Sequence, residues 1–160
     1  ENWIDDYLSA PVWSFVLSKG VWGDDLLYGA IMPSVDRVGR YFPFVAFIKP
    51  KSSVKDSLAQ LSKLSALLPE LLQTELAPDE IIPYLTLALS KQSLSADEFP
   101  PVEIENSLTP AVMTFDTYWW SEGVLPVGYN AFTAQQVLGP QLFVRLFSSC
   151  TSVTETIHPK

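Results

Sequence analysis

The residues whose types could do chemistry gather in one polar segment between two apolar stretches. Its run MPSVDRVGRYFP, which begins at Met32, contains Ser34, Asp36, Arg37 and Arg40. Asp36 stands four residues before Arg40 and next to Arg37, so an ion pair within the segment could brace it while the second guanidinium faces outward. A guanidinium is a planar fork that binds carboxylates and phosphates. The segment is therefore a candidate partner-binding surface, with the alternative that both arginines pin it to neighbouring elements.

The chain contains few of the residues from which common catalytic sites are built. His158 is the only histidine and lies in a polar terminal stretch, so histidine-dependent triads and zinc sites are not expected. Ser34 has no evident general base, and capping of a short turn is the favoured role for it. Cys150 is the only cysteine, which excludes an intrachain disulfide and fits a reducing compartment. No glycine-rich phosphate loop occurs. We expect no catalytic residue, no metal and no cofactor.

A second candidate for partner binding is the tryptophan pair Trp119 and Trp120. On a strand the two side chains point to opposite faces of the sheet. One is therefore expected in the core, and the other lies either beneath a helix or on the surface, where tryptophan is a strong interface anchor. The core is the favoured position.

The composition limits which classes of protein the chain can belong to. The 160 residues are 48% hydrophobic and 12% aromatic, enough for the core of one domain. The formal net charge of −8 opposes binding to nucleic acid or to an acidic membrane surface. No apolar run approaches the roughly 18 residues that span a bilayer. We expect neither a nucleic-acid partner nor membrane insertion.

The first part of the chain is predicted to form a helix and three strands. Apolar residues at helical spacing precede Pro11, and three short apolar stretches follow. The strands are too close in sequence for a crossover helix, so they form an antiparallel meander. The polar residues Pro33–Arg40 form a structured loop, in which Gly39 can take a positive φ. The predicted ranges are 3–8 for the helix and 12–17, 26–32 and 41–48 for the strands.

The rest of the chain is predicted to be mainly helical. Ser53 and Asp56 approximate a capping box, and Pro69 ends that helix or begins the next. A further helix begins at Pro78 and runs to about residue 90, a strand covers 112–121, and Thr133 with Gln136 caps a helix that Gly139-Pro140 interrupts before 142–147. The prediction is a single α+β domain over residues 1–147, with a mainly antiparallel sheet flanked by helices and a polar tail at 148–160.

Three runs resemble one known family. They are YLSAPVWSFVL from Tyr7, GAIMPSVDRVGRYFP from Gly29, and YWW from Tyr118, and they resemble the TagF family of type VI secretion-associated proteins. The MPSVDRVGRYFP run is long and specific. The match is strong through Ile48, thin across residues 53–90, and recovers at the paired tryptophans. Relatives carry a glycine-rich segment with a lysine-leucine-proline motif before the first helix, which this chain lacks.

The resemblance implies a cytoplasmic bacterial accessory protein that acts without chemistry. Such proteins repress assembly or firing of the secretion system post-translationally, by binding a forkhead-associated scaffold protein. The expected partner surface is formed by Ser34, Asp36, Arg37, Arg40 and one of the tryptophans. The alternative is a small-ligand-binding or hydrolytic α+β module that uses the segment from Ser34 to Arg40. A deep pocket beside that segment would favour the alternative.

Overall fold

The computed structural model describes residues 3–91, 116–121, 130–134, 139–147 and 156–157. These residues form four helices and six strands. In chain order they are α1 (Trp3–Ser9), β1 (Trp13–Leu17), β2 (Leu27–Val35), β3 (Tyr41–Ile48), α2 (Val54–Leu71), α3 (Pro78–Lys91), β4 (Thr117–Ser121), β5 (Asn130–Ala134), α5 (Pro140–Phe147) and β6 (Thr156–Ile157).

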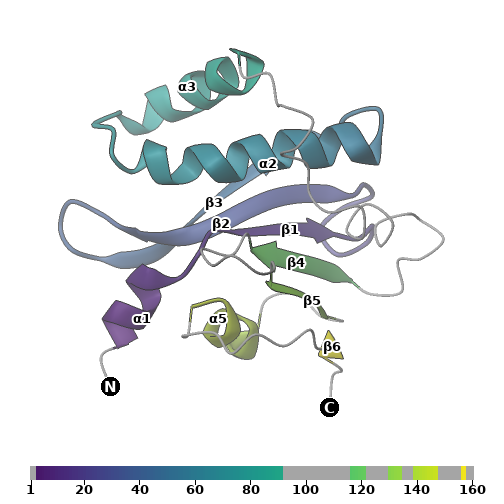
Figure 1. Ribbon diagram of the computed structural model, residues 1–160, viewed down its shortest axis with the longest axis horizontal. Coiled ribbons are helices and arrows are strands. Elements are labelled where there is room, and N and C mark those ends of the chain that lie inside the picture. Colours follow the sequence, from purple (N-terminus) through teal and green to yellow (C-terminus); the bar gives the residue numbers. More distant parts are fainter. Residues whose placement is uncertain (1–2, 92–115, 122–129, 135–138, 148–155, 158–160) are drawn as a thin grey trace.

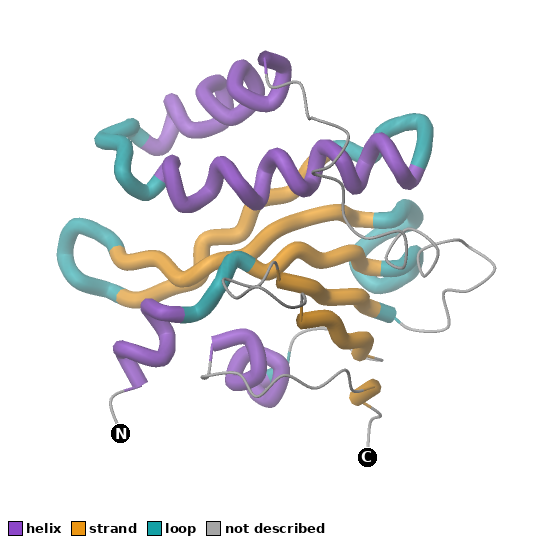
Figure 2. The backbone as a smooth tube through the Cα atoms, in the orientation of Figure 1, coloured by secondary structure: helices purple, strands orange, loops and turns teal. Residues whose placement is uncertain are grey.

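The strands form one sheet that separates two groups of helices. The strand order is β3-β2-β1-β4-β5-β6, and every neighbouring pair is antiparallel except β5 and β6. Helices α2 and α3 lie on one side of the sheet, with α3 stacked on α2, whereas α1 and α5 lie on the other side (Figure 1, Figure 2). The predicted α+β fold with a mainly antiparallel sheet is confirmed.

The predicted meander of β1, β2 and β3 is confirmed, but the second strand is longer than expected. β2 pairs with β3 as far as Val35 opposite Tyr41, so Pro33 and Ser34 belong to the strand. The predicted loop Pro33–Arg40 is therefore wrong at its start. The strand continues because β3 pairs along its whole length, which outweighs the local turn preference of proline and serine.

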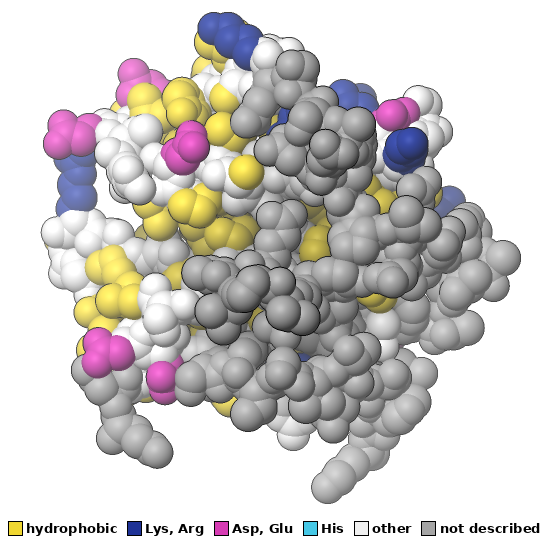
Figure 3. All heavy atoms as spheres, in the orientation of Figure 1, with side chains coloured by type: hydrophobic (Ala, Val, Ile, Leu, Met, Phe, Trp, Pro, Cys, Tyr) yellow, Lys and Arg dark blue, Asp and Glu magenta, His cyan; other side chains and the backbone are white. Residues whose placement is uncertain are grey.

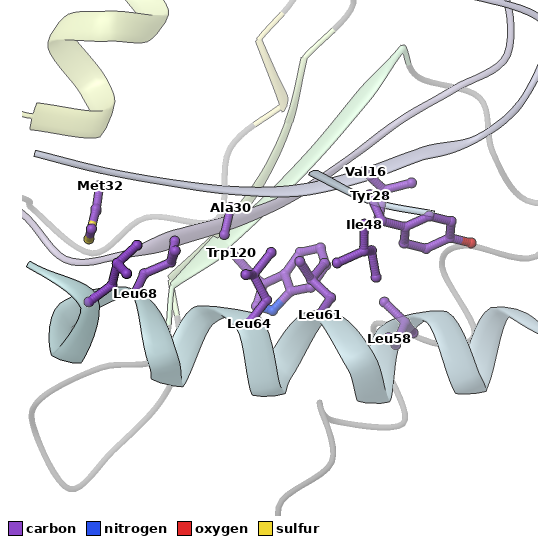
Figure 4. Packing of buried hydrophobic residues seen from close by; sticks show 11 residues of the cluster. Val16, Tyr28, Ala30, Met32, Ile48, Leu58, Leu61, Leu64, Leu68 and Trp120 are labelled. Carbon is purple, nitrogen blue, oxygen red and sulfur yellow. The ribbon is translucent and has the colours of Figure 1, made fainter. Parts of the chain in front are cut away.

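One core lies between the sheet and α2. Leucines on a single stripe of α2 meet apolar side chains from alternate positions of the strands (Figure 4). The helix starts as predicted, since the Ser53 side chain accepts a hydrogen bond from the Asp56 backbone N–H at 3.0 Å. Pro69 was predicted to end α2 or begin the next helix; instead it lies inside α2, and the burial of Leu68 and Leu71 favours continuation of the helix past it.

A second core lies on the opposite face, beneath α5. The Trp13 indole donates a hydrogen bond to the Leu146 carbonyl at 2.9 Å, which ties β1 to α5. The Phe15 and Trp119 rings pack with centroids 4.6 Å apart. The sheet is therefore buried on both faces at β1 and β4, which explains why β1 is apolar without alternation.

Two predictions in the last third of the chain are corrected. Thr133 was predicted to cap a helix, but it lies in β5 opposite Tyr118, because cross-strand pairing replaces the local capping pattern. The helix predicted at 142–147 is α5, which begins earlier, at Pro140, since the missing proline N–H costs nothing in a first helical turn. The predicted interruption after Leu138 is not tested, because residues 135–138 lie outside the described residues. β4 begins at Thr117; residues 112–115 and the predicted cap partner Gln136 lie outside the described residues. Thr156 and Ile157, in the predicted tail, pair with β5.

Gly29 makes the approach of β1, β2 and β3 possible. A Cβ atom at this position would lie 2.5 Å from Cζ of Phe15 and 2.9 Å from the Ala46 carbonyl oxygen. Gly29→Ala is expected to lower the free energy of unfolding by about 1–3 kcal/mol, measured by urea denaturation. The double variant Gly29→Ala/Phe15→Leu should lose less stability than the two single variants together, because the smaller side chain at position 15 relieves the clash. Strict additivity of the two changes would contradict the proposed clash.

Candidate partner-binding hairpin

The turn between β2 and β3 is a compact hairpin loop with its own hydrogen bonds. The Gly39 N–H donates to the Asp36 carbonyl and the Asp36 N–H to the Arg40 carbonyl, both at 3.0 Å. Gly39 has a φ of 81°, the left-handed conformation that glycine takes without cost. This pattern is that of a tight turn followed by a glycine bulge, which holds the strands in register. The predicted positive φ at Gly39 is confirmed.

Asp36 braces this loop from the inside. One carboxylate oxygen accepts hydrogen bonds from the backbone N–H groups of Val38 and Arg40, at 3.0 and 2.9 Å. The other accepts the Arg40 Nε–H at 2.6 Å, so the ion pair that was expected within the segment is made with Arg40. The Arg40 backbone hydrogen bond is the main reason why the pKa of Asp36 lies below its usual value, and the Arg40 side chain and the Val38 N–H add to it. Asp36 therefore holds the loop and is not itself free to bind a partner.

The tip of the hairpin presents cationic and apolar side chains. Arg37 is exposed, Val38 is 75% exposed, and the Arg40 side chain is 78% exposed despite its ion pair. Arg37 makes no ion pair with any residue that the structure describes. The hairpin projects at the left of Figure 1, where basic and apolar side chains reach the surface side by side (Figure 3).

Ser34 does not belong to this exposed tip. Its side chain is buried and its hydroxyl donates to the Phe42 carbonyl at 2.8 Å. The prediction of Ser34 as part of a partner-binding surface is therefore corrected: it joins β2 to β3. Because that hydroxyl is already a donor within the sheet, it is not poised for nucleophilic attack.

Tyr7 supports the hairpin from α1 and was not recognised in the sequence. Its hydroxyl accepts a hydrogen bond from the Ser34 N–H at 3.1 Å and lies 3.4 Å from the Ser34 carbonyl, to which it donates. Burial of the ring raises the Tyr7 pKa, and the Ser34 backbone opposes that rise. The helical stripe marked Tyr7 as apolar, but no sequence pattern shows which backbone groups its hydroxyl meets.

An aromatic cluster surrounds Tyr7 at the base of the hairpin. Tyr41, the first residue of β3, packs edge-on against Tyr7 and Trp3, with centroids 6.1 and 5.5 Å away. Phe147 and Phe143 of α5 lie on the other side of Tyr7. Trp3, Tyr41 and Phe143 are each between 39% and 59% exposed, so the cluster has an open surface next to the hairpin.

Removing only the Tyr7 hydroxyl isolates its role in the hairpin. Tyr7→Phe keeps the ring but leaves two buried backbone groups of Ser34 without this partner. The expected loss is about 1–3 kcal/mol in the free energy of unfolding, measured by urea denaturation. Tyr41→Phe is the matched control, since Tyr41 lies in the same cluster with an exposed side chain. Equal losses for both variants would contradict the proposed bridge.

The two tryptophans are both core residues. Trp119 is fully buried against Phe15 and Trp120 is 2% exposed beneath α2, on opposite faces as predicted. The favoured core position is confirmed for both side chains, and the alternative of one exposed partner anchor is wrong, because helices cover both faces of β4. The exposed aromatic side chains of α1, β3 and α5 take that place beside the hairpin.

The cleft and the metal-ligand groups of the described part of the chain give no support to chemistry at the hairpin. The large cleft that the structure shows lies between β3, α2 and α3, and no residue from 34 to 40 lines it. Within the described ranges, no three histidine, cysteine or acidic side chains gather to hold a metal ion. None of the described helices is long and apolar enough to cross a membrane.

Comparison with known proteins identifies the family. Residues 1–91 match the family model of the TagF N-terminal domain, described as type VI secretion system-associated. The fold is similar to the crystal structure of PA0076 from Pseudomonas aeruginosa PAO1, with a TM-score of 0.54 and 20% sequence identity over 99% of this chain and 79% of that one. No curated protein sequence matches the chain. The matched domain contains the hairpin, its brace and the residues of α1 that support it, and the chain accordingly belongs to the TagF family of type VI secretion system-associated proteins.

Proposed function

We propose that the chain is a non-enzymatic cytoplasmic protein that represses type VI secretion post-translationally. It does so by binding a forkhead-associated scaffold protein of the system and preventing assembly or firing. Membership of the TagF family supports the link to type VI secretion. The single observation that supports binding as the mode of action is the braced hairpin with Arg37, Val38 and Arg40 at its tip.

The brace makes the hairpin suited to recognition. Asp36 fixes the loop through two backbone hydrogen bonds and one ion pair, so the tip loses little conformational freedom when a partner binds. The outward guanidinium of Arg37 can form two parallel hydrogen bonds with a carboxylate or phosphate of the scaffold. Val38 and the exposed rings of Trp3 and Tyr41 supply the apolar contact beside it.

The hydrolytic alternative is not favoured by these contacts. Ser34 is buried and already donates its hydroxyl hydrogen, while Asp36 is committed to the loop. An acid–base pair would require both groups to leave their hydrogen bonds. The same residues are better used in holding a binding surface in shape.

Repression can be tested in a bacterium that carries an active type VI secretion system. Raising the level of the wild-type protein should lower the amount of a secreted effector in the culture medium, with the intracellular effector level unchanged. The Arg37→Ala/Arg40→Ala variant at the same level should leave secretion intact. Secretion that is insensitive to the wild-type protein would overturn the proposed repression, and equal repression by both proteins would overturn the role of the hairpin.

A further inference from the structure

A cleft lies between the outer side of β3 and the two helices α2 and α3. Its volume is about 1330 Å³, larger than the roughly 300–1,000 Å³ of most small-molecule pockets. One wall is the stretch Phe44–Ile48 of β3 with the residues that follow it, and the others come from α2 and α3. The size and elongated lining fit a length of polypeptide better than a metabolite.

The strand that lines this cleft has an open edge. Among the described strands, β3 ends the sheet and pairs with β2 alone. Natural edge strands are usually protected by charges, prolines or bulges. Such residues flank the stretch Phe44–Ile48, with Pro43 before it in β3 and Lys49 directly after the strand, while the stretch itself contains neither a charge nor a proline. No described strand pairs with the outer backbone groups of this stretch.

Apolar side chains lie on both sides of the position that an added strand would take. Ile81, Leu85 and Leu89 of α3 line the cleft and are only partly buried. On the other face of β3, Val45 and Phe47 are 39% and 44% exposed. Successive side chains of an added strand alternate between these two faces, so both sets would be covered at once.

The charges around the cleft favour an added strand that carries acidic side chains. Lys49, Lys51 and Lys63 line the cleft. Among the described residues of the lining, Asp56 alone is acidic, and it accepts a hydrogen bond from the Ser53 hydroxyl at the helix cap. This contrasts with the net charge of −8 for the chain. A second copy of the chain fits poorly, because antiparallel pairing of two β3 strands about their middle would bring Arg40 of one copy near Lys51 of the other.

We propose that β3 accepts an extended segment of a partner protein as an additional strand in this cleft. The segment carries apolar side chains at alternate positions and acidic side chains at the end that lies beside Lys49 and Lys51. The partner adds to the sheet through its backbone, and the lysines fix its direction. This site is separate from the hairpin and does not depend on the proposed repression.

Amide hydrogen exchange tests whether the edge is open and can be filled. The probe is a synthetic peptide of alternating valine and threonine that ends in two glutamates. The amides of Phe44–Ile48 that face away from β2 should exchange rapidly in the free protein and become at least about tenfold slower with the peptide. A peptide with prolines in place of the central threonines should give no protection. Exchange unaffected by the valine–threonine peptide would overturn the proposal.

The free protein also reveals any other occupant. Protection that disappears on dilution would show that a second copy covers β3, and protection at every concentration would show that another part of this chain covers it. Either result overturns the proposal.

Two pairs of variants test the lining and the charge. Ile82→Ser, which removes an exposed side chain of the cleft wall, should weaken peptide binding about fivefold, while Leu87→Ser on the same helix but outside the cleft should not. Lys49→Glu/Lys51→Glu should reverse the preference, favouring a peptide that ends in two lysines; Lys19→Glu is the control for net charge. An unchanged preference in the reversed variant would overturn the assigned acidic segment.

Discussion

Trp119→Ala is expected to lower the free energy of unfolding by about 3–5 kcal/mol, measured by urea denaturation. The side chain is fully buried, its ring packs on Phe15 at 4.6 Å, and its indole N–H donates to the Thr117 hydroxyl at 2.9 Å. The substitution opens a cavity beneath α5 and leaves the Thr117 hydroxyl without this donor. The expected loss is therefore a large fraction of the roughly 5–15 kcal/mol by which ordinary domains are stable.

Trp22→Ala is the matched control for this prediction. Trp22 is 65% exposed and meets Phe47 edge-on at 5.8 Å, so its loss should cost less than about 1.5 kcal/mol. Comparable losses for the two variants would contradict the assignment of Trp119 to the core. A small effect of Trp119→Ala on stability, together with lost partner binding, would restore it as an interface residue.

The second large effect is expected at the hairpin tip. Arg37→Ala/Arg40→Ala should weaken binding of the forkhead-associated scaffold by about a hundredfold, since each charge-assisted hydrogen bond contributes roughly 1.5–3 kcal/mol. Stability should change little, because both side chains are exposed. Thermal unfolding of the variant checks that its fold is retained.

The single variants separate binding from bracing. Arg37→Ala leaves the Asp36–Arg40 ion pair in place and should lose affinity alone. Arg40→Ala also removes the side-chain partner of Asp36, so the pKa of that carboxyl should rise towards its usual value. Arg37→Lys keeps the charge without the planar fork and should recover only part of the affinity. Full recovery of the affinity by lysine would show that the scaffold recognises only the positive charge at position 37.

Local patterns in the sequence predict most of the fold in the first part of the chain. These patterns depend on interactions between residues that are close in sequence, so the folded protein keeps the structure that they predict. They are the apolar stretches at β1 and β3, the Ser53 cap and the first-turn proline at Pro78. An ion pair of Asp36 within its segment could be predicted for the same reason, since the partners belong to one turn, whereas the choice of Arg40 over Arg37 could not.

The features that could not be predicted depend on long-range contacts. Ser34 is buried because Tyr7 and Phe42 reach it from other elements. Thr133 carries a local capping pattern, yet pairing with β4 places it in a strand. The exposed aromatic surface beside the hairpin is built from α1, β3 and α5, and no periodic pattern in the sequence shows that these elements meet.

The same dependence explains the tryptophans. Alternation along a strand correctly separates Trp119 from Trp120, but it does not say whether each face is covered. That depends on α5, which follows β4 in the chain, and on α2, which precedes it. Both helices cover the sheet, and so both side chains are buried.

The most direct test of the account is titration calorimetry of this protein against the forkhead-associated scaffold of the same secretion system. The proteins compared are the wild type, Arg37→Ala and Lys19→Ala, the last being a control for the loss of one exposed cation. The account predicts the same Kd for the wild type and Lys19→Ala, and a Kd about tenfold higher for Arg37→Ala. Absence of binding by the wild type, or equal Kd values for all three proteins, would contradict it.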